Sequence, residues 1–269
     1  MTRQASLGMY DFPWLAWAND ALWADIARRL RAVGLAGVPD HLDRTRPRDE
    51  IVRDPDVLLA HTCGYPLVTA LGGVVRPVAT PRYALPGCEG AWHRSLVVVR
   101  EAAPYERLDQ LRGKRAALNG FDSNTGMNLL RAAVAPLAGG RPFFADLLVT
   151  GAHLESLAAV RSGRADVAAV DCVTHGLAAR HRPDLVAGTR VLAWTEATPS
   201  LPLVTRAAAP EAEVAALRSA LDAAAADPDL AEARAALALD GFEVLPLAAY
   251  RRVLDLERAA AAAGYPALA

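Results

Sequence analysis

The sequence predicts an α/β protein, because short apolar runs alternate with helical segments along most of its 269 residues. Residues 14–30 carry apolar side chains at helical spacing, which indicates a long first helix. Residues 57–60 form a compact apolar run between a proline and a polar turn, as a buried strand does. Apolar residues make up 53% of the chain and charged residues 22%, which is enough apolar material for packed cores. We therefore expect mostly parallel sheets flanked by helices.

The remaining elements follow from the same patterns. Strands are expected at residues 5–9, 57–60, 74–79, 95–100, 114–119, 147–150, 165–170, 189–194 and 201–205. Helices are expected at residues 14–30, 125–135, 154–161 and 173–180, with a brief helix after residue 66 and a short helix or turn at 108–113. From residue 211 onward the chain is expected to be nearly all helix, and residues 39–47 and 81–90 have the composition of connections.

Charge and cysteine usage exclude several classes of partner. The net charge is −1 and no basic tract is present, so nucleic acid is not expected as a partner. Cys63, Cys88 and Cys172 are far apart and show no metal-ligand spacing, so we expect neither a metal nor another cofactor. The odd number of cysteines favours free thiols in a reducing compartment.

The N-terminal sequence bears on localisation. Its first ten residues mix polar and apolar types, without the basic and apolar regions of an export signal. No segment approaches the roughly 18 consecutive apolar residues of a membrane span, so direct membrane insertion is not expected. As it stands, the sequence predicts a cytoplasmic protein, with the periplasm as the alternative if a signal peptide precedes it.

The turn at residues 119–128 is the central candidate for a binding site. An apolar run ends at Asn119, a short polar turn follows, and an amphipathic helix begins at about Thr125. Ser123, Asn124 and Thr125 are good N-cap residues, since short polar side chains bind the unpaired N–H groups of a first helical turn. A ligand that replaces some of these caps would meet the N–H groups and the positive end of the helix dipole. The alternative is a capped turn without a ligand.

Four other candidates also follow predicted strands, where α/β folds bind ligands. Tyr10 and Tyr65 offer phenolic donors, and His153 offers a ring nitrogen. Neutral donors of this kind suit an oxyanion. Asp171 differs, because a carboxylate repels an anion, and it would accept from a protonated ligand oxygen or an amino group. Their structural alternatives are a packing tyrosine, a turn residue, a helix-cap histidine and a helix N-cap aspartate. The other histidines are interpreted as surface or packing residues.

An enzymatic role is disfavoured. Cys63 or Cys172 beside His153 would supply a nucleophile and a base, yet no orienting third member is evident and buried cysteines are commonly inert. The sequence also lacks the motifs of P-loop enzymes, serine hydrolases, zinc proteases and dinucleotide-binding proteins. We therefore expect a non-catalytic binding protein.

The order of these stretches resembles the phosphate/phosphite/phosphonate substrate-binding proteins of ABC transporters, which have the type II periplasmic-binding-protein fold. The resemblance rests on residues 9–13, 61–66, 119–128, 150–156 and 163–171. It implies two α/β lobes that are joined by two crossover strands and close over a ligand in the cleft between them. Lobe 1 would hold residues 1–90 and 200–269, and lobe 2 residues 91–199. The implied partners are a small-molecule oxyanion ligand and an ABC transporter permease.

The resemblance also implies a ligand-binding set. It places the hydroxyl-rich turn on the phosphoryl oxygens, and Asn124 departs from the family there, where small hydroxyl residues are more common. The expected set contains Tyr10, Tyr65, Asn119, Ser123, Asn124, Thr125, Gly126, His153 and Asp171. The function expected is a solute-binding protein for phosphate, phosphite or a phosphonate-like ion. The alternative is a cytoplasmic metabolite sensor or lyase-type enzyme on the same fold.

Overall fold

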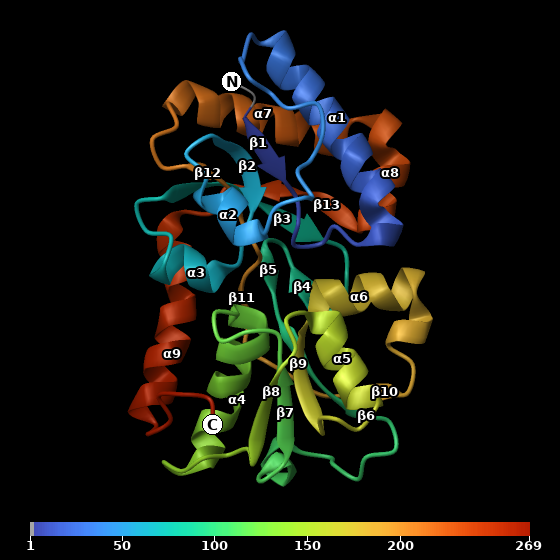
Figure 1. The fold of residues 1–269 in the computed structure, drawn as a ribbon, viewed down its shortest axis with the longest axis vertical. Coiled ribbons are helices and arrows are strands. Elements are labelled where there is room, and N and C mark those ends of the chain that lie inside the picture. Colours follow the sequence, from blue (N-terminus) through green and yellow to red (C-terminus); the bar gives the residue numbers. More distant parts are fainter. Residues whose placement is uncertain (1–2) are drawn as a thin grey trace. The chain divides into compact units, whose positions relative to one another are not determined.

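The computed structural model describes residues 3–269, and the chain divides into two compact units. Unit 1 comprises the residues up to Ala84, together with Glu89–Ala91 and Pro199–Tyr250. Unit 2 comprises Leu85–Cys88, Trp92–Thr198 and Arg251–Ala269. Each unit combines a five-stranded sheet with helices, which confirms the predicted α/β class (Figure 1).

The sheet of unit 1 has the order β1-β2-β12-β3-β13. Its strands are β1 (Gln4–Ser6), β2 (Val57–His61), β3 (Val75–Tyr83), β12 (Leu203–Arg206) and β13 (Leu239–Glu243). Strands β1 and β2 pair in parallel, whereas β12 pairs antiparallel with both β2 and β3. The three strands β1, β2 and β3 therefore run in one direction, and β12 is inserted between β2 and β3 in the other.

The helices of unit 1 begin with η1 (Pro13–Leu15) and α1 (Ala16–Ala32). The others are α2 (Arg48–Arg53), α3 (Gly64–Thr69), α7 (Glu211–Ala226), η5 (Pro228–Leu230) and α8 (Ala231–Leu237), and η6 (Leu247–Arg251) ends the unit. Leu22, Ile26 and Leu30 repeat every fourth residue on α1 and are buried. Helix α1 packs against α7 and α8, so this apolar face closes the core on one side (Figure 1).

An ion-pair cluster also holds unit 1 together. The carboxylate of Glu213, in α7, is only 7% exposed and binds two guanidinium groups. Arg3 donates to it at 2.6 and 2.9 Å, and Arg206 donates at 2.7 and 3.0 Å. Because both contacts are bidentate, the buried charge is well paired, as burial requires. The cluster joins the entry to β1, the end of β12 and the first turn of α7.

The sheet of unit 2 has the order β10-β6-β9-β7-β8. Its strands are β6 (Ser95–Arg100), β7 (Arg115–Leu118), β8 (Asp146–Val149), β9 (Val167–Asp171) and β10 (Thr189–Trp194). Its helices are η2 (Leu108–Leu111), η3 (Asn124–Asn128), α4 (Leu129–Ala138), α5 (His153–Arg161), α6 (Cys172–His181), η4 (Pro183–Leu185) and α9 (Arg252–Ala262). Strand β7 lies between β9 and β8 and pairs with both in parallel.

Three short strands lie where the chain passes between the units. They are β4 (Cys88–Glu89), β5 (Trp92–His93) and β11 (Thr198–Pro199), paired in the order β11-β5-β4. In the described part of the chain, no helix is both long and apolar enough to cross a membrane.

The structure corrects the expected sheet pattern in two places. Strand β13 interrupts the region that was predicted to be nearly all helix, because residues 239–243 pair with β3 and form an edge strand of the sheet. The pairing in the sheets is mixed rather than mostly parallel. In unit 2, β7, β8, β9 and β10 run in one direction, but β6 is inserted between β10 and β9 in the other.

The C-terminal segment also differs from its expected place. Residues 251–269 were assigned to lobe 1 with the rest of the C-terminal region, and they lie in unit 2. Helix α9 packs against α4 and η3 (Figure 1), and the backbone carbonyl of Val253 accepts a hydrogen bond from Asn128. The carbonyl of Ala269 binds the N–H groups of Phe143 and Phe144. These contacts fix the segment to unit 2.

Candidate functional site

Three polar segments meet at one edge of the sheet in unit 2. Strands β7, β8 and β9 run in the same direction, so their carboxyl ends lie together. Residue 119 follows β7, residue 150 follows β8, and Asp171 is the last residue of β9. Backbone hydrogen bonds from Thr150 to Leu118 and from Gly151 to Asn119 continue the pairing beyond the strands. The convergence expected from the sequence is therefore present for this unit.

The turn after β7 enters its helix through a π-helical turn, η3. Ser123 is the N-cap, and its Oγ accepts from the N–H of Gly126 at 2.9 Å. The N–H of Asn128 binds the carbonyl of Ser123, five residues earlier, so the turn is one residue wider than an α-turn. Within the described residues, no backbone acceptor outside η3 binds the N–H groups of Thr125 and Met127. The turn thus presents unpaired donors at a helix N-terminus.

A buried side-chain network holds this turn in place. Asn128 is fully buried, and its Nδ2 donates to Asn124 Oδ1 and to the carbonyl of Val253, both at 3.0 Å. Its Oδ1 accepts from Arg131 Nη2 at 2.5 Å. Asn124 Nδ2 in turn donates to Thr198 Oγ1 at 2.9 Å. The side-chain amide of Asn124 is therefore committed to the protein, which explains why an amide stands where hydroxyl residues were expected.

Thr125 links the turn to the neighbouring segments. Its Oγ1 lies 2.9 Å from His153 Nε2, so one of the two groups donates to the other. His153 is the first residue of α5, directly after the β8 turn. The carbonyl of Thr125 accepts from Ser95 Oγ at 2.9 Å. Two of the predicted residues, Thr125 and His153, are thus in direct contact.

Gly126 is required by a close approach of Asn119. A Cβ atom at position 126 would lie 1.8 Å from Asn119 Oδ1 and 3.2 Å from Ser123 Oγ. Asn119 Oδ1 is buried and has no hydrogen-bond partner among the described residues. The glycine therefore lets the Asn119 carboxamide reach the first turn of the helix.

Asp171 forms a buried ion pair with His93. Both side chains are 1% exposed, and Asp171 Oδ2 lies 3.2 Å from His93 Nδ1. Asp171 Oδ1 accepts from the N–H of Thr174, so Asp171 is also the N-cap of α6. Burial disfavours the charged carboxylate, but the contacts with His93 outweigh burial and lower the pKa of Asp171 to about 2. Burial likewise opposes the charged imidazole, and the contact with Asp171 raises the pKa of His93.

Tyr10 and Tyr65 belong to unit 1. Tyr10 is 4% exposed, and its ring meets those of His61 and Tyr83 edge-on, at centroid distances of 5.4 and 5.3 Å. Tyr65 is half-buried in the first turn of α3, where its carbonyl accepts from Thr69.

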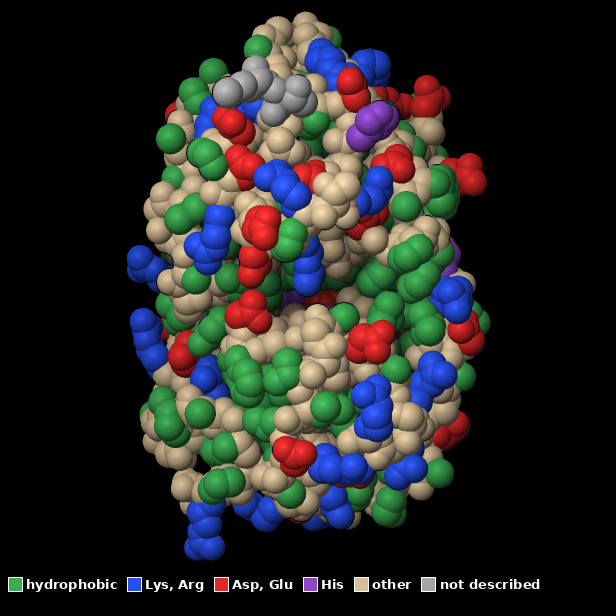
Figure 2. Space-filling view, viewed as in Figure 1, with side chains coloured by type: hydrophobic (Ala, Val, Ile, Leu, Met, Phe, Trp, Pro, Cys, Tyr) green, Lys and Arg blue, Asp and Glu red, His purple; other side chains and the backbone are tan. Residues whose placement is uncertain are grey.

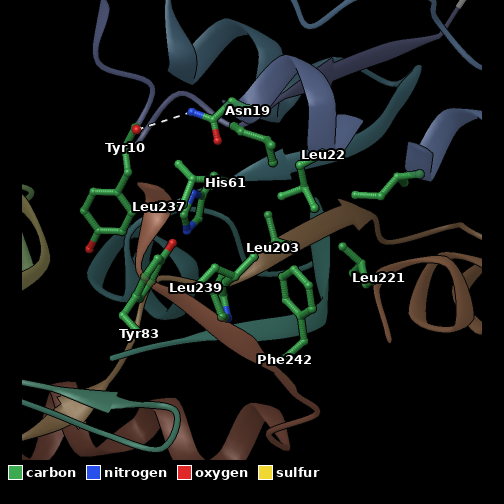
Figure 3. A pocket seen from close by; sticks show the side chains of 13 residues that line it. Tyr10, Asn19, Leu22, His61, Tyr83, Leu203, Leu221, Leu237, Leu239 and Phe242 are labelled. Atoms are coloured by element: carbon green, nitrogen blue, oxygen red, sulfur yellow. Dashed lines mark hydrogen bonds between the residues drawn. The ribbon is translucent and has the colours of Figure 1, made fainter. Parts of the chain in front are cut away.

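A small cavity lies beside Tyr10 in unit 1 (Figure 3). Tyr10, Asn19, His61 and Tyr83 line part of it, and the rest is lined by apolar side chains, mostly leucines. Its volume is about 30 Å³, which holds only one or two water molecules. Most of its lining is apolar, so it offers few hydrogen-bond donors to an oxyanion.

Several residues at the turn were not singled out from the sequence. Asn128 and Thr198 support Asn124, Ser95 binds the Thr125 carbonyl, and His93 pairs with Asp171. Each of these residues contacts a partner that is distant in the sequence, or it had already been given another role. Local sequence patterns therefore did not reveal it. The sequence shows one hint: His93 lies close to the expected boundary between lobe 1, whose first segment ends at residue 90, and lobe 2.

Replacing Gly126 with alanine should destabilise the turn. The new methyl group would overlap Asn119 Oδ1, and relieving such overpacking typically costs about 1–3 kcal/mol. Urea denaturation should show this loss of free energy of unfolding. Gly72→Ala is the matched control, because a Cβ atom there meets nothing within 4 Å. Equal stability of the two variants would contradict the close approach.

Replacing His93 with glutamine should remove a pH-dependent stabilisation. The pKa of Asp171 is about 2 in the folded chain against 3.8 ordinarily, so its contribution is present above pH 3.8 and is lost as the pH falls through about 2. The pKa of His93 is raised, so its contribution is present below 6.5 and is lost as the pH rises through the folded value. Urea denaturation across pH should show a cost on the order of 2 kcal/mol between about pH 4 and 6.5.

The control for this measurement is His41→Gln, which changes an exposed histidine. Its free energy of unfolding should follow that of the wild type at every pH. If the difference between the wild type and His93→Gln were the same above and below pH 6.5, the ion pair would not be the cause.

Comparisons with known proteins identify a family and a fold for the chain. A family model described as "ABC transporter, phosphonate, periplasmic substrate-binding protein" matches residues 51–250. Among curated proteins, none is similar enough to count as a match. A solved protein from Xanthomonas citri, bound to a chloride ion, is 21% identical with a TM-score of 0.71, over 97% of this chain and 98% of its own.

Two further structures are phosphonate-binding proteins. PhnD1 from Prochlorococcus marinus, in complex with methylphosphonate, is 14% identical with a TM-score of 0.73, over 96% of this chain and 97% of its own. A binding protein component of an ABC phosphonate transporter from Pseudomonas aeruginosa is 14% identical with a TM-score of 0.72, over 97% and 88%. At such identities the likeness concerns the fold, which is the type II periplasmic-binding-protein fold. Since the family model covers most of the chain, the protein belongs to the phosphonate substrate-binding family of periplasmic ABC-transporter proteins.

Proposed function

We propose that the chain binds the oxyanion group of a phosphonate, phosphate or phosphite at the N-terminal turn of η3 and carries out no chemistry on it. The observation that supports this proposal most strongly is the set of hydrogen-bond donors at this turn. Within the described residues, the N–H groups of Thr125 and Met127 bind no backbone acceptor outside η3, and the hydroxyl groups of Ser123 and Thr125 lie on the same turn. Such a helix terminus combines hydrogen-bond donors with the positive end of the helix dipole.

The two hydroxyl groups are suited to donate. Ser123 Oγ already accepts from Gly126, which leaves its proton for a ligand oxygen. Thr125 Oγ1 accepts from His153 when Nε2 carries the proton, and in that tautomer the threonine proton is available too. We propose that His153 orients Thr125 in this way. The Asn119 carboxamide would gain a partner from a protonated ligand oxygen.

For Asn124 and Asp171 we propose roles that differ from the first expectation. The Asn124 side chain binds Thr198 and Asn128, so we propose that Asn124 supports the turn and does not contact the ligand through its amide. Asp171 uses its two oxygens for Thr174 and His93. We propose that it keeps α6 capped, and that the positive charge of His93 weakens its repulsion of an anion.

The proposed contribution of unit 1 comes from two tyrosines. Tyr65 is half-buried and offers a phenolic donor, whereas Tyr10 is packed among aromatic rings. We propose that units 1 and 2 correspond to the two lobes of the family, that Tyr10 and Tyr65 lie on the ligand-facing part of unit 1, and that an ABC transporter permease is the partner. The methylphosphonate complex of PhnD1 supports the choice of ligand class.

The thiol-enzyme alternative is not supported by Cys172. Its sulfur lies 3.5 Å from Cys88 Sγ, and its side chain is buried. The contact with Cys88, burial and the neighbouring Asp171 all raise the pKa of the Cys172 thiol. A nucleophilic cysteine needs the opposite shift.

Calorimetry with methylphosphonate, phosphate and phosphite is the direct test of binding. Ser123→Ala should weaken the affinity about tenfold, because a lost hydrogen bond to a charged ligand is worth about 1.5 kcal/mol. Ser162→Ala, an exposed serine at the end of α5, is the matched control and should bind like the wild type. Absence of binding by all three ions at millimolar concentration would remove the ligand class. Equal affinities of Ser123→Ala and the wild type would remove the turn as the site.

A further inference from the structure

Two thiols face each other in unit 2 beside the candidate site. Cys172 is the first residue of α6 and is 1% exposed, and Cys88 is half-buried in β4. Their sulfur atoms are 3.5 Å apart, although 84 positions separate them in the sequence. Cys88 is the last residue of its segment before the chain enters unit 1. The binding function uses neither thiol.

The segment that carries Cys88 is packed tightly on α6. A Cβ atom at Gly87 would lie 3.0 Å from Cys172 Cβ and 2.4 Å from the ring of Trp194. A Cβ atom at Gly176 would lie 3.0 Å from the side chain of Leu85. Glycine at both positions lets residues 85–88 approach the helix at two places, one near each end of the segment. Cys88 is therefore held in place against Cys172.

We propose that Cys88 and Cys172 form a reversible disulfide that fastens residues 85–88 to the first turn of α6. A disulfide places its sulfur atoms about 2.05 Å apart, so the two must approach by roughly 1.5 Å. Rotation of the half-buried Cys88 side chain is the simplest route to this approach. A periplasmic location, as in the family, would expose the pair to oxidising conditions.

The exposure of the two thiols sets the order of the reaction. The more accessible Cys88, as thiolate, attacks a small disulfide oxidant such as oxidised glutathione, forms a mixed disulfide and expels one glutathione thiolate. The sulfur of Cys172 then attacks Cys88 Sγ, and its proton goes to the second departing glutathione. The protein loses two protons and two electrons, and the oxidant takes them up to become two thiols. The raised pKa of Cys172 makes the second step the slower one.

Thiol counting with intact-mass measurement tests the pair directly and does not depend on ligand binding. The reduced protein carries three thiols, and treatment with oxidised glutathione should leave one, with the mass lowered by two hydrogen atoms. Peptide mapping without reduction should join the peptides that contain Cys88 and Cys172. A reductant should restore all three thiols. The oxidised form should also melt several degrees higher, because the crosslink restricts the unfolded chain.

Single substitutions separate the two steps. Cys172→Ser should accumulate a stable glutathione adduct on Cys88, because the resolving thiol is gone. Cys88→Ser should leave the buried Cys172 reduced. Cys63→Ser is the matched control, and it should form the same crosslink as the wild type. Circular dichroism of each reduced variant should match the wild type, which shows that folding is unchanged.

Three outcomes would overturn the proposal. They are a wild type that keeps three thiols under the oxidant, a wild type that stops at the mixed disulfide on Cys88, and a crosslink that includes Cys63. In urea, where the packing of residues 85–88 is lost, formation of the crosslink should be disfavoured by roughly tenfold or more. An equal yield in urea would show that the folded structure does not bring the thiols together.

Discussion

The buried carboxamide of Asn128 is the interaction on which the candidate site depends. Its two donors and its acceptor are used by Asn124, Val253 and Arg131, so the group is satisfied although it is fully buried. Burial makes each of these bonds costly to break, because water cannot reach a buried group to replace the partner that it has lost. The network fixes a π-helical turn, a form that is rare and often functional. The unpaired N–H groups of the turn are positioned as a consequence.

This arrangement explains how neutral hydroxyl and N–H groups can bind an anion. Charge is nearby, but Asp171 is already paired with His93. On the face drawn in Figure 2, acidic and basic side chains are interspersed. The donors themselves are hydroxyl and N–H groups fixed by the fold. Fixed dipoles need little reorganisation when a ligand arrives, and they recognise an oxyanion by geometry rather than by net charge. A chain that carries a net charge of −1 needs such local recognition.

The sequence predicted the parts of the site that depend on local order, and it missed those that depend on distant contacts. The capped turn at residues 123–125 and the strand ends near His153 and Asp171 follow from apolar runs and cap residues, which are local signals. Strand β13 was missed because Asp240 and Gly241 are poor strand residues, and pairing with β3 overrides that preference. The contact of His93 with Asp171 and the attachment of α9 to unit 2 have no local signal at all.

Arg131 adds a long-range electrostatic attraction for an anion at the turn. It is 4% exposed and lies six residues after Thr125. Its positive charge attracts an anion bound at the turn. Glu257 lies 3.8 Å from its guanidinium and is one-third exposed, so it offsets part of this attraction. The guanidinium thus serves two purposes, since the bond to Asn128 that shapes the turn also keeps a positive charge behind it.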